Sequence, residues 1–65
     1  MKNHIKELRA EHKLSQDALA EKLGVSRQTI ISLEKGRYNP SITLAFKVAR
    51  VFNCQIEDVF VYEEE

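Results

Sequence analysis

The strongest constraint in this sequence is a very short gap between two helical segments. Residues 16–23 carry apolar side chains with helical spacing, and a second helical pattern follows Ser26 and ends at Gly36. Gly24 stands where a helix needs a left-handed residue in order to stop. Because only about two residues separate the two helices, they cannot lie antiparallel and must cross sharply. The small side chain of Ala20 suits a close approach at that crossing.

Capping residues predict where the helices begin. Ser15 precedes the first of the two crossing helices, and Asp17 lies in its first turn, where the helix dipole favours an anion. Asn3 is the expected N-cap of an earlier helix, in which Ile5 and Leu8 share one apolar stripe.

The C-terminal half predicts a further helix, one helical turn and a short strand. Pro40 disfavours helix at the residue before it, and Ser41 caps an apolar helix over residues 42–52. Residues 56–60 are expected to form one more helical turn, and the segment 60–62 is β-prone. The fold class is therefore all-α, with four to five short helices around a central helix-turn-helix and a short C-terminal β-strand.

Size and composition exclude several classes of function. The 65 residues form a single domain, residues 1–65, which buries only about 60% of its unfolded surface. Cys54 is the only cysteine, and His4 and His12 lack the spacing of a zinc site, so we expect no disulfide, no metal and no cofactor. No catalytic arrangement or pocket is indicated, and we expect no enzyme. Without a signal peptide or a membrane-length apolar run, we expect a cytoplasmic protein that binds no membrane.

The net charge of zero conceals an uneven distribution. All ten Lys and Arg residues lie within residues 2–50 against five acidic residues, which leaves this segment at +5. Residues 51–65, including the acidic tail 63–65, carry five acidic residues and no Lys or Arg, and are therefore −5. This asymmetry allows a basic face that attracts a polyanion.

The segment LSQDALAEKLGVSRQTIISLEKGRYNPS, residues 14–41, resembles the xenobiotic-response-element family, which includes the DNA-binding domains of phage Cro and CI repressors. The resemblance covers residues 3–60 and implies a lambda-repressor-like fold that binds double-stranded DNA. It is most similar to compact stand-alone members, such as the cytolysin-operon repressor, which lack a ligand-sensing domain. No small-molecule ligand is therefore expected.

The resemblance also implies a role for individual residues. The third helix becomes the recognition helix, with its base-reading positions at Ser26, Arg27, Gln28 and Ser32. Arginine can bind guanine O6 and N7 bidentately, and glutamine can do the same with adenine N6 and N7. The positions expected to contact DNA phosphates are Gln16, Thr29, Lys35, Arg37, Tyr38, Asn39 and Ser41. Arg9 and Glu34 match a structural salt bridge of the family.

The C-terminal segment has two interpretations. In the first, Val59, Phe60, Val61 and Tyr62 form the interface of a homodimer, as a β extension does in compact relatives. In the second, the same segment packs over the fourth helix within one chain. We expect a homodimeric repressor of a pseudo-palindromic operator.

A protein-interaction module is the alternative function. In this case the chain neutralises a partner, as an antitoxin does, and represses the operon that encodes both. An exposed apolar patch outside the dimer interface favours this alternative, and Ile31 is the candidate residue that the sequence offers.

Overall fold

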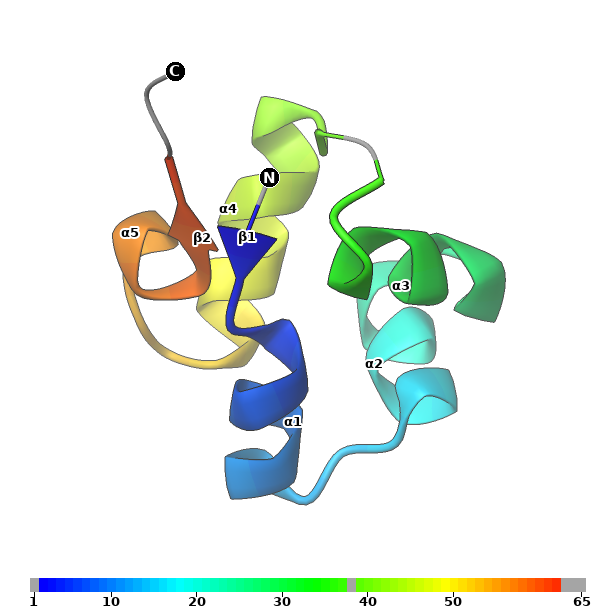
Figure 1. The fold of residues 1–65 in the computed structure, drawn as a ribbon. Coiled ribbons are helices and arrows are strands. Elements are labelled where there is room, and N and C mark those ends of the chain that lie inside the picture. The colour runs from blue at the N-terminus through cyan, green and yellow to red at the C-terminus, as the bar shows by residue number, and fades with distance from the viewer. Residues whose placement is uncertain (1, 38, 63–65) are drawn as a thin grey trace.

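The structure is a computed structural model that describes residues 2–37 and 39–62. Within these ranges it has five short helices and two strands of two residues each (Figure 1). The fold class predicted from the sequence is confirmed. In chain order the elements are β1 (Lys2–Asn3), α1 (Ile5–His12), α2 (Gln16–Leu23), α3 (Arg27–Glu34), α4 (Ile42–Val51), α5 (Ile56–Val59) and β2 (Phe60–Val61).

Three serines begin three of the helices. The Oγ atoms of Ser15, Ser26 and Ser41 each accept a hydrogen bond from the backbone N–H three residues later, at 3.0, 3.2 and 3.1 Å. The first N–H groups of a helix have no partner within it, so a serine cap stabilises each start by about 0.5–2 kcal/mol relative to alanine. These bonds confirm the predicted starts of α2, α3 and α4.

Gly24 makes the sharp crossing of α2 and α3 possible. It adopts a left-handed conformation with φ of 72°. This conformation is unfavourable for residues with a Cβ atom, and glycine has none. The backbone N–H of Val25 then donates to the carbonyl of Ala20 at 3.0 Å, which closes the end of α2. The chain enters α3 directly after Ser26, and the two helices pack against each other (Figure 1).

The predicted N-cap at Asn3 is wrong in position. The helix α1 begins at Ile5, and His4 occupies the capping position without a side-chain hydrogen bond that caps the helix. Asn3 lies in β1, where strand pairing holds its backbone extended, but its Oδ1 still accepts from the N–H of Ile5 at 3.2 Å. Its Nδ2 donates to the carbonyl of Leu33 at 2.7 Å, so Asn3 connects the start of α1 to α3.

The two ends of the described chain pair as a small antiparallel sheet. Lys2 lies opposite Val61 and Asn3 opposite Phe60 (Figure 1). The N–H of His4 extends this pairing by donating to the carbonyl of Val59 at 2.8 Å. The β-prone C-terminal segment therefore has its strand partner within the same chain.

Every helix contributes to one hydrophobic core. Val59 is completely buried and Phe60 is 8% exposed, so both side chains belong to the core of a single chain. Their place at a dimer interface stays a prediction, in which the exposed surface would come mainly from Val61 and Tyr62. The six largest fully buried side chains are Ile5, Leu19, Ile30, Leu33, Val48 and Val59.

Candidate nucleic-acid interface

The helix α3 presents a polar end to solvent while its apolar side anchors it. Ile30 and Leu33 are buried in the core, and they hold the helix in a fixed rotation about its axis. Ser26, Arg27 and Gln28, around the N-terminus of α3, are exposed. The first turn of this helix is therefore both rigidly mounted and accessible.

Thr29 and Ser32, two further polar residues of α3, are half-buried. Thr29 is close to Ser26, with the two hydroxyl oxygens 3.1 Å apart, so its side chain takes part in the N-terminal cap. Ser32 lies one turn later and its backbone carbonyl accepts from the N–H of Arg37 at 3.1 Å. The small side chain of Ser32 leaves space for a close approach to the surface of α3.

An ion pair connects α1 with the end of α3. Arg9 Nε lies 2.6 Å from Glu34 Oε2, and Arg9 Nη2 donates to Glu34 Oε1 at 3.2 Å. Arg9 Nη1 also donates to the carbonyl of Leu14 at 3.1 Å. The two side chains are only 15% and 11% exposed, so this bidentate contact is screened little by water. The structure thus brings together the two residues that the resemblance pairs.

Gln16 joins this ion pair to the exposed end of α3. Its Nε2 donates to Glu34 Oε1 at 3.2 Å, and its Oε1 accepts from Arg27 Nε at 3.4 Å. A polar chain therefore runs from Arg9 through Glu34 and Gln16 to Arg27. It links the first residue of α2 to both ends of α3.

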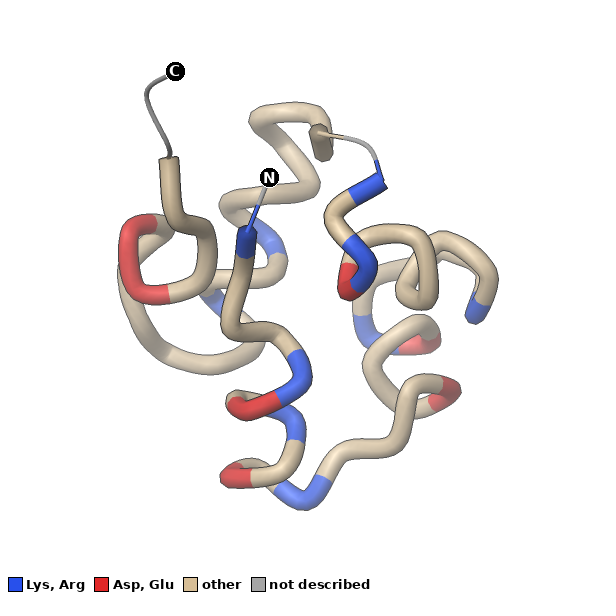
Figure 2. Tube along the Cα trace, in the orientation of Figure 1, with Lys and Arg blue, Asp and Glu red and all other residues tan. Residues whose placement is uncertain are grey.

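The connection from α3 to α4 carries the basic residues that the sequence predicts to contact phosphate. Lys35, Arg37, Asn39 and Ser41 are all exposed. Figure 2 shows basic residues at the end of α3 and in the segment after it, and an acidic pair on α5, Glu57 and Asp58. Tyr38, which belongs to the same predicted set, lies outside the described residues, as does the acidic tail 63–65.

Exposed acidic residues are not confined to α5. Asp17 and Glu21 are exposed on α2, the helix that packs against α3. Asp17 Oδ1 lies 3.9 Å from Arg27 Nε. The sequence predicted only that Asp17 lies in the first turn of α2, where the helix dipole favours an anion, and nothing in its spacing predicted its approach to α3.

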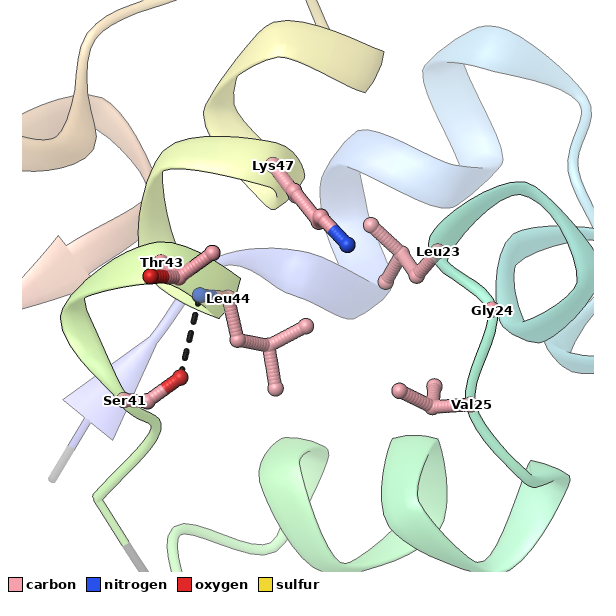
Figure 3. A pocket seen from close by; sticks show the side chains of 7 residues that line it. All are labelled: Leu23, Gly24, Val25, Ser41, Thr43, Leu44 and Lys47. Carbon is pink, nitrogen blue, oxygen red and sulfur yellow. Dashed lines mark hydrogen bonds between the residues drawn. The ribbon is translucent and has the colours of Figure 1, made fainter.

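A hollow of about 240 Å³ separates the start of α4 from the turn between α2 and α3. In Figure 3 the Leu44 and Val25 side chains face this space from opposite sides, and Lys47 extends from α4 towards Leu23. The dashed line is the cap bond from the Leu44 N–H to Ser41 Oγ. The lining residues are Leu23, Gly24, Val25, Ser41, Thr43, Leu44 and Lys47.

Among residues 2–37 and 39–62, three large apolar side chains are exposed. They are Ile42, which is 73% exposed, Phe46 at 55% and Tyr62 at 78%. Ile42 and Phe46 lie four residues apart and therefore share one side of α4. The sequence did not predict the exposure of these two, although both fall outside the apolar stripe of α4 that fills the core. Ile31, the apolar residue predicted for a surface contact, is half-buried.

Cys54 and the histidines form no site in the described part of the chain. Burial raises the pKa of the Cys54 thiol, and the nearby Asp58 carboxylate raises it further, so the thiol form is favoured. The His12 ring contacts the Phe52 ring at a centroid distance of 5.2 Å. Among residues 2–37 and 39–62, no group of three or more His, Cys, Asp and Glu side chains is placed to hold a metal ion. In the same ranges no helix has the length and apolar character to cross a membrane.

The turn between α2 and α3, with the exposed polar start of α3, defines a helix-turn-helix DNA-binding domain. Comparison with known families agrees: the helix-turn-helix model HTH_3 matches residues 5–59. The chain belongs to this family, which is of the xenobiotic-response-element or Cro/CI type. It is a transcriptional regulator with a helix-turn-helix DNA-binding fold.

Similar proteins include regulators from archaea, bacteria and a phage. The chain is 60% identical over 65 residues to the HTH-type transcriptional regulator MJ0272 of Methanocaldococcus jannaschii, covering 100% of this chain and 98% of that protein. It is 38% identical to the immunity repressor protein of Bacillus phage phi105, covering 94% of this chain and 46% of the repressor.

Among solved structures, the fold resembles SinR from Bacillus subtilis. The crystal structure of SinR in complex with DNA, where SinR is described as the master regulator for biofilm formation, superposes with a TM-score of 0.74 at 37% identity. The match covers 82% of this chain and 86% of the SinR chain. SinR is thus a structural neighbour that binds DNA with this fold.

Proposed function

We propose that this protein is a sequence-specific repressor that binds a pseudo-palindromic operator as a homodimer. The observation that carries the proposal is the exposed pair Arg27 and Gln28 in the first turn of α3, on a helix anchored by Ile30 and Leu33. In helix-turn-helix proteins this end of the recognition helix enters the major groove. The similarity to a phage immunity repressor supports repression as the outcome.

We assign base reading to four residues. Arg27 is suited to guanine and Gln28 to adenine, and each bidentate pair provides about 1–3 kcal/mol of discrimination against the wrong base. Ser26 and Ser32 add short contacts at the two edges of this surface. Their small side chains bring the backbone of α3 close to the base edges.

Phosphate contacts surround the base-reading residues and fix the position of α3 in the groove. They come from the start of α2, the first turn of α3, the connection to α4 and the start of α4. Exposed cations and the N–H groups at helix starts suit this role. The residues we assign to it are Gln16, Thr29, Lys35, Arg37, Tyr38, Asn39 and Ser41.

A homodimer provides the second recognition helix. One α3 of eight residues reads only one half-site, whereas two copies about 34 Å apart read successive major grooves. We assign the contact between the copies to Val61 and Tyr62, because Tyr62, directly after β2, is 78% exposed. In this proposal residues 1–65 act as one domain that works on DNA in the cytoplasm.

Selection from a pool of random duplex DNA tests the proposal. We expect a two-fold symmetric site with half-sites about 10 base pairs apart. Arg27→Ala is expected to lose a guanine preference at one position of each half-site. Arg50→Ala is the matched control, since it removes an exposed arginine from α4 and should keep that preference. If the protein enriches no sequence and binds only weakly in a salt-sensitive way, the proposal is wrong.

One observation favours the alternative function, a module that neutralises a protein partner and autoregulates its operon. Ile42 and Phe46 form an exposed apolar pair on α4, separate from β2. If this pair is the partner surface, Phe46→Ala should abolish association with a co-purifying protein while operator binding persists. If Phe46→Ala changes neither property, the pair has no such role.

A further inference from the structure

Two oxygen atoms from the first turn of α2 approach the guanidinium of Arg27. Gln16 Oε1 lies 3.4 Å from Arg27 Nε, and Asp17 Oδ1 lies 3.9 Å from the same nitrogen. In both pairs the nearest guanidinium atom is Nε, the nitrogen closest to the aliphatic part of the side chain. The edge formed by Nη1 and Nη2, at the far end of the group, is then left to contact a base.

The amide of Gln16 is held in the orientation that this contact needs. Glu34 is a carboxylate and therefore only accepts hydrogen bonds, so the NH₂ group of Gln16 must face Glu34. The amide oxygen then faces Arg27. Because Arg9 fixes Glu34 from α1, the position of this oxygen is determined by packing in the body of the protein.

Asp17 adds a full negative charge on the same edge. We propose that Asp17 is a specificity-determining residue, which together with Gln16 positions the Arg27 guanidinium for an end-on contact with guanine. This inference rests on the proposed function of Arg27. The carboxylate competes with DNA phosphates for the guanidinium, so Arg27 is less available for contacts that carry no sequence information.

The exposure of this pair argues against a role in stability. The side chains of Arg27 and Asp17 are 60% and 75% exposed, and ion pairs at such exposed positions contribute little to folding. The fold is therefore expected to tolerate substitution of Asp17. We expect the charge of Asp17 to affect DNA binding rather than folding.

The test compares Asp17→Asn with Glu21→Gln. Both remove one negative charge from an exposed position on α2, but only Asp17 approaches Arg27. Dissociation constants are measured for three duplexes at one salt concentration: the selected operator, the same operator with the Arg27-dependent guanine replaced, and a random sequence. The ratio between the first two measures discrimination and cancels any loss of folded protein.

We expect Asp17→Asn to lower this ratio by about 3- to 10-fold, which is part of the discrimination that one base contact provides, and to tighten binding to random DNA. Glu21→Gln should leave the ratio unchanged, and Asp17→Glu should retain most of it. If Asp17→Asn and Glu21→Gln shift binding to all three duplexes by the same factor, Asp17 acts only through net charge and the inference is overturned. If the wild type itself has no guanine preference, the proposed role of Arg27 fails and the role of Asp17 fails with it.

Discussion

The guanidinium of Arg9 and the carboxylate of Glu34 meet through two contacts, at 2.6 and 3.2 Å, and join α1 to the last residue of α3. The start of α3 is held separately by the Ser26 cap and by the contact between Gln16 and Arg27. The helix α3 is thus fixed at both ends by polar contacts and along its length by apolar ones. A rigid mounting of this kind would keep the side chains that we propose to read bases in register with a groove.

Loss of one partner of this ion pair should destabilise the fold. Arg9→Met leaves Glu34 only 11% exposed and without its cation, so we expect the free energy of unfolding to fall by about 2–3 kcal/mol. Urea denaturation monitored by circular dichroism measures the change. Lys6→Met is the control on the exposed side of α1 and should change stability by less than about 0.5 kcal/mol. The pair is not structural if both variants unfold at the same urea concentration.

Substitution of Gly24 tests the turn between α2 and α3. No atom lies within 4 Å of a Cβ built at this position, so the cost comes only from its φ of 72°. We expect Gly24→Ala to lower the free energy of unfolding by about 1 kcal/mol, or the melting temperature by about 4–8 °C. Gly24→Asn should cost less, because asparagine tolerates the left-handed conformation. Equal melting temperatures for wild type and Gly24→Ala would contradict this.

The basic residues after α3 should contribute affinity without sequence preference. Lys35→Ala and Arg37→Ala are each expected to weaken binding to operator and random DNA by a similar factor. The slope of log K against log salt concentration is negative, and each substitution should make it less negative by about 0.9. Titrations at several salt concentrations measure both effects, with Arg50→Ala as the reference for charge loss on another helix. A change confined to one base pair would instead assign the residue to base reading.

Tyr62 tests the proposed contact between two copies. Its side chain is 78% exposed, so Tyr62→Ala should leave the stability of a single chain nearly unchanged. We expect the variant to shift sedimentation equilibrium towards the monomer and to weaken operator binding at low protein concentration. Phe46→Ala removes an exposed aromatic ring from another element and is the matched control. If it is Phe46→Ala that yields the monomer, the contact lies on α4 and the assignment to Tyr62 is wrong.

The Cys54 thiol should add a pH dependence to stability. Its pKa in the folded chain is raised above the ordinary value of 9.0, first by burial and then by Asp58. The unfolded chain therefore loses the thiol proton at lower pH than the folded chain, and this ionisation favours unfolding as the pH rises past about 9. Urea denaturation of wild type and Cys54→Ala across this range measures the difference. The two should diverge with increasing pH, and parallel curves would rule out the shift.

Several long-range features could not be predicted from the sequence. The β-prone residues predicted the strand Phe60–Val61, but Lys2–Asn3 is too short for an alternating pattern, so nothing in the sequence indicated that the two pair. Without that pairing, Val59 and Phe60 looked available for a dimer interface. The exposure of Ile42 and Phe46 was missed for a similar reason, since the pattern of α4 identifies its core stripe but not what covers the opposite side.

The sequence by itself determined the helices, their serine caps, the left-handed stop at Gly24 and hence the sharp crossing of α2 and α3. These features depend on contacts between residues three to five positions apart, which local composition specifies directly. Only the tertiary structure decided that Gln16 and Asp17 face Arg27, that Asn3 bonds to the carbonyl of Leu33 and that the two chain ends pair. These contacts join residues from 10 to about 60 positions apart. Their geometry follows from how the helices pack around the core, which no local pattern specifies.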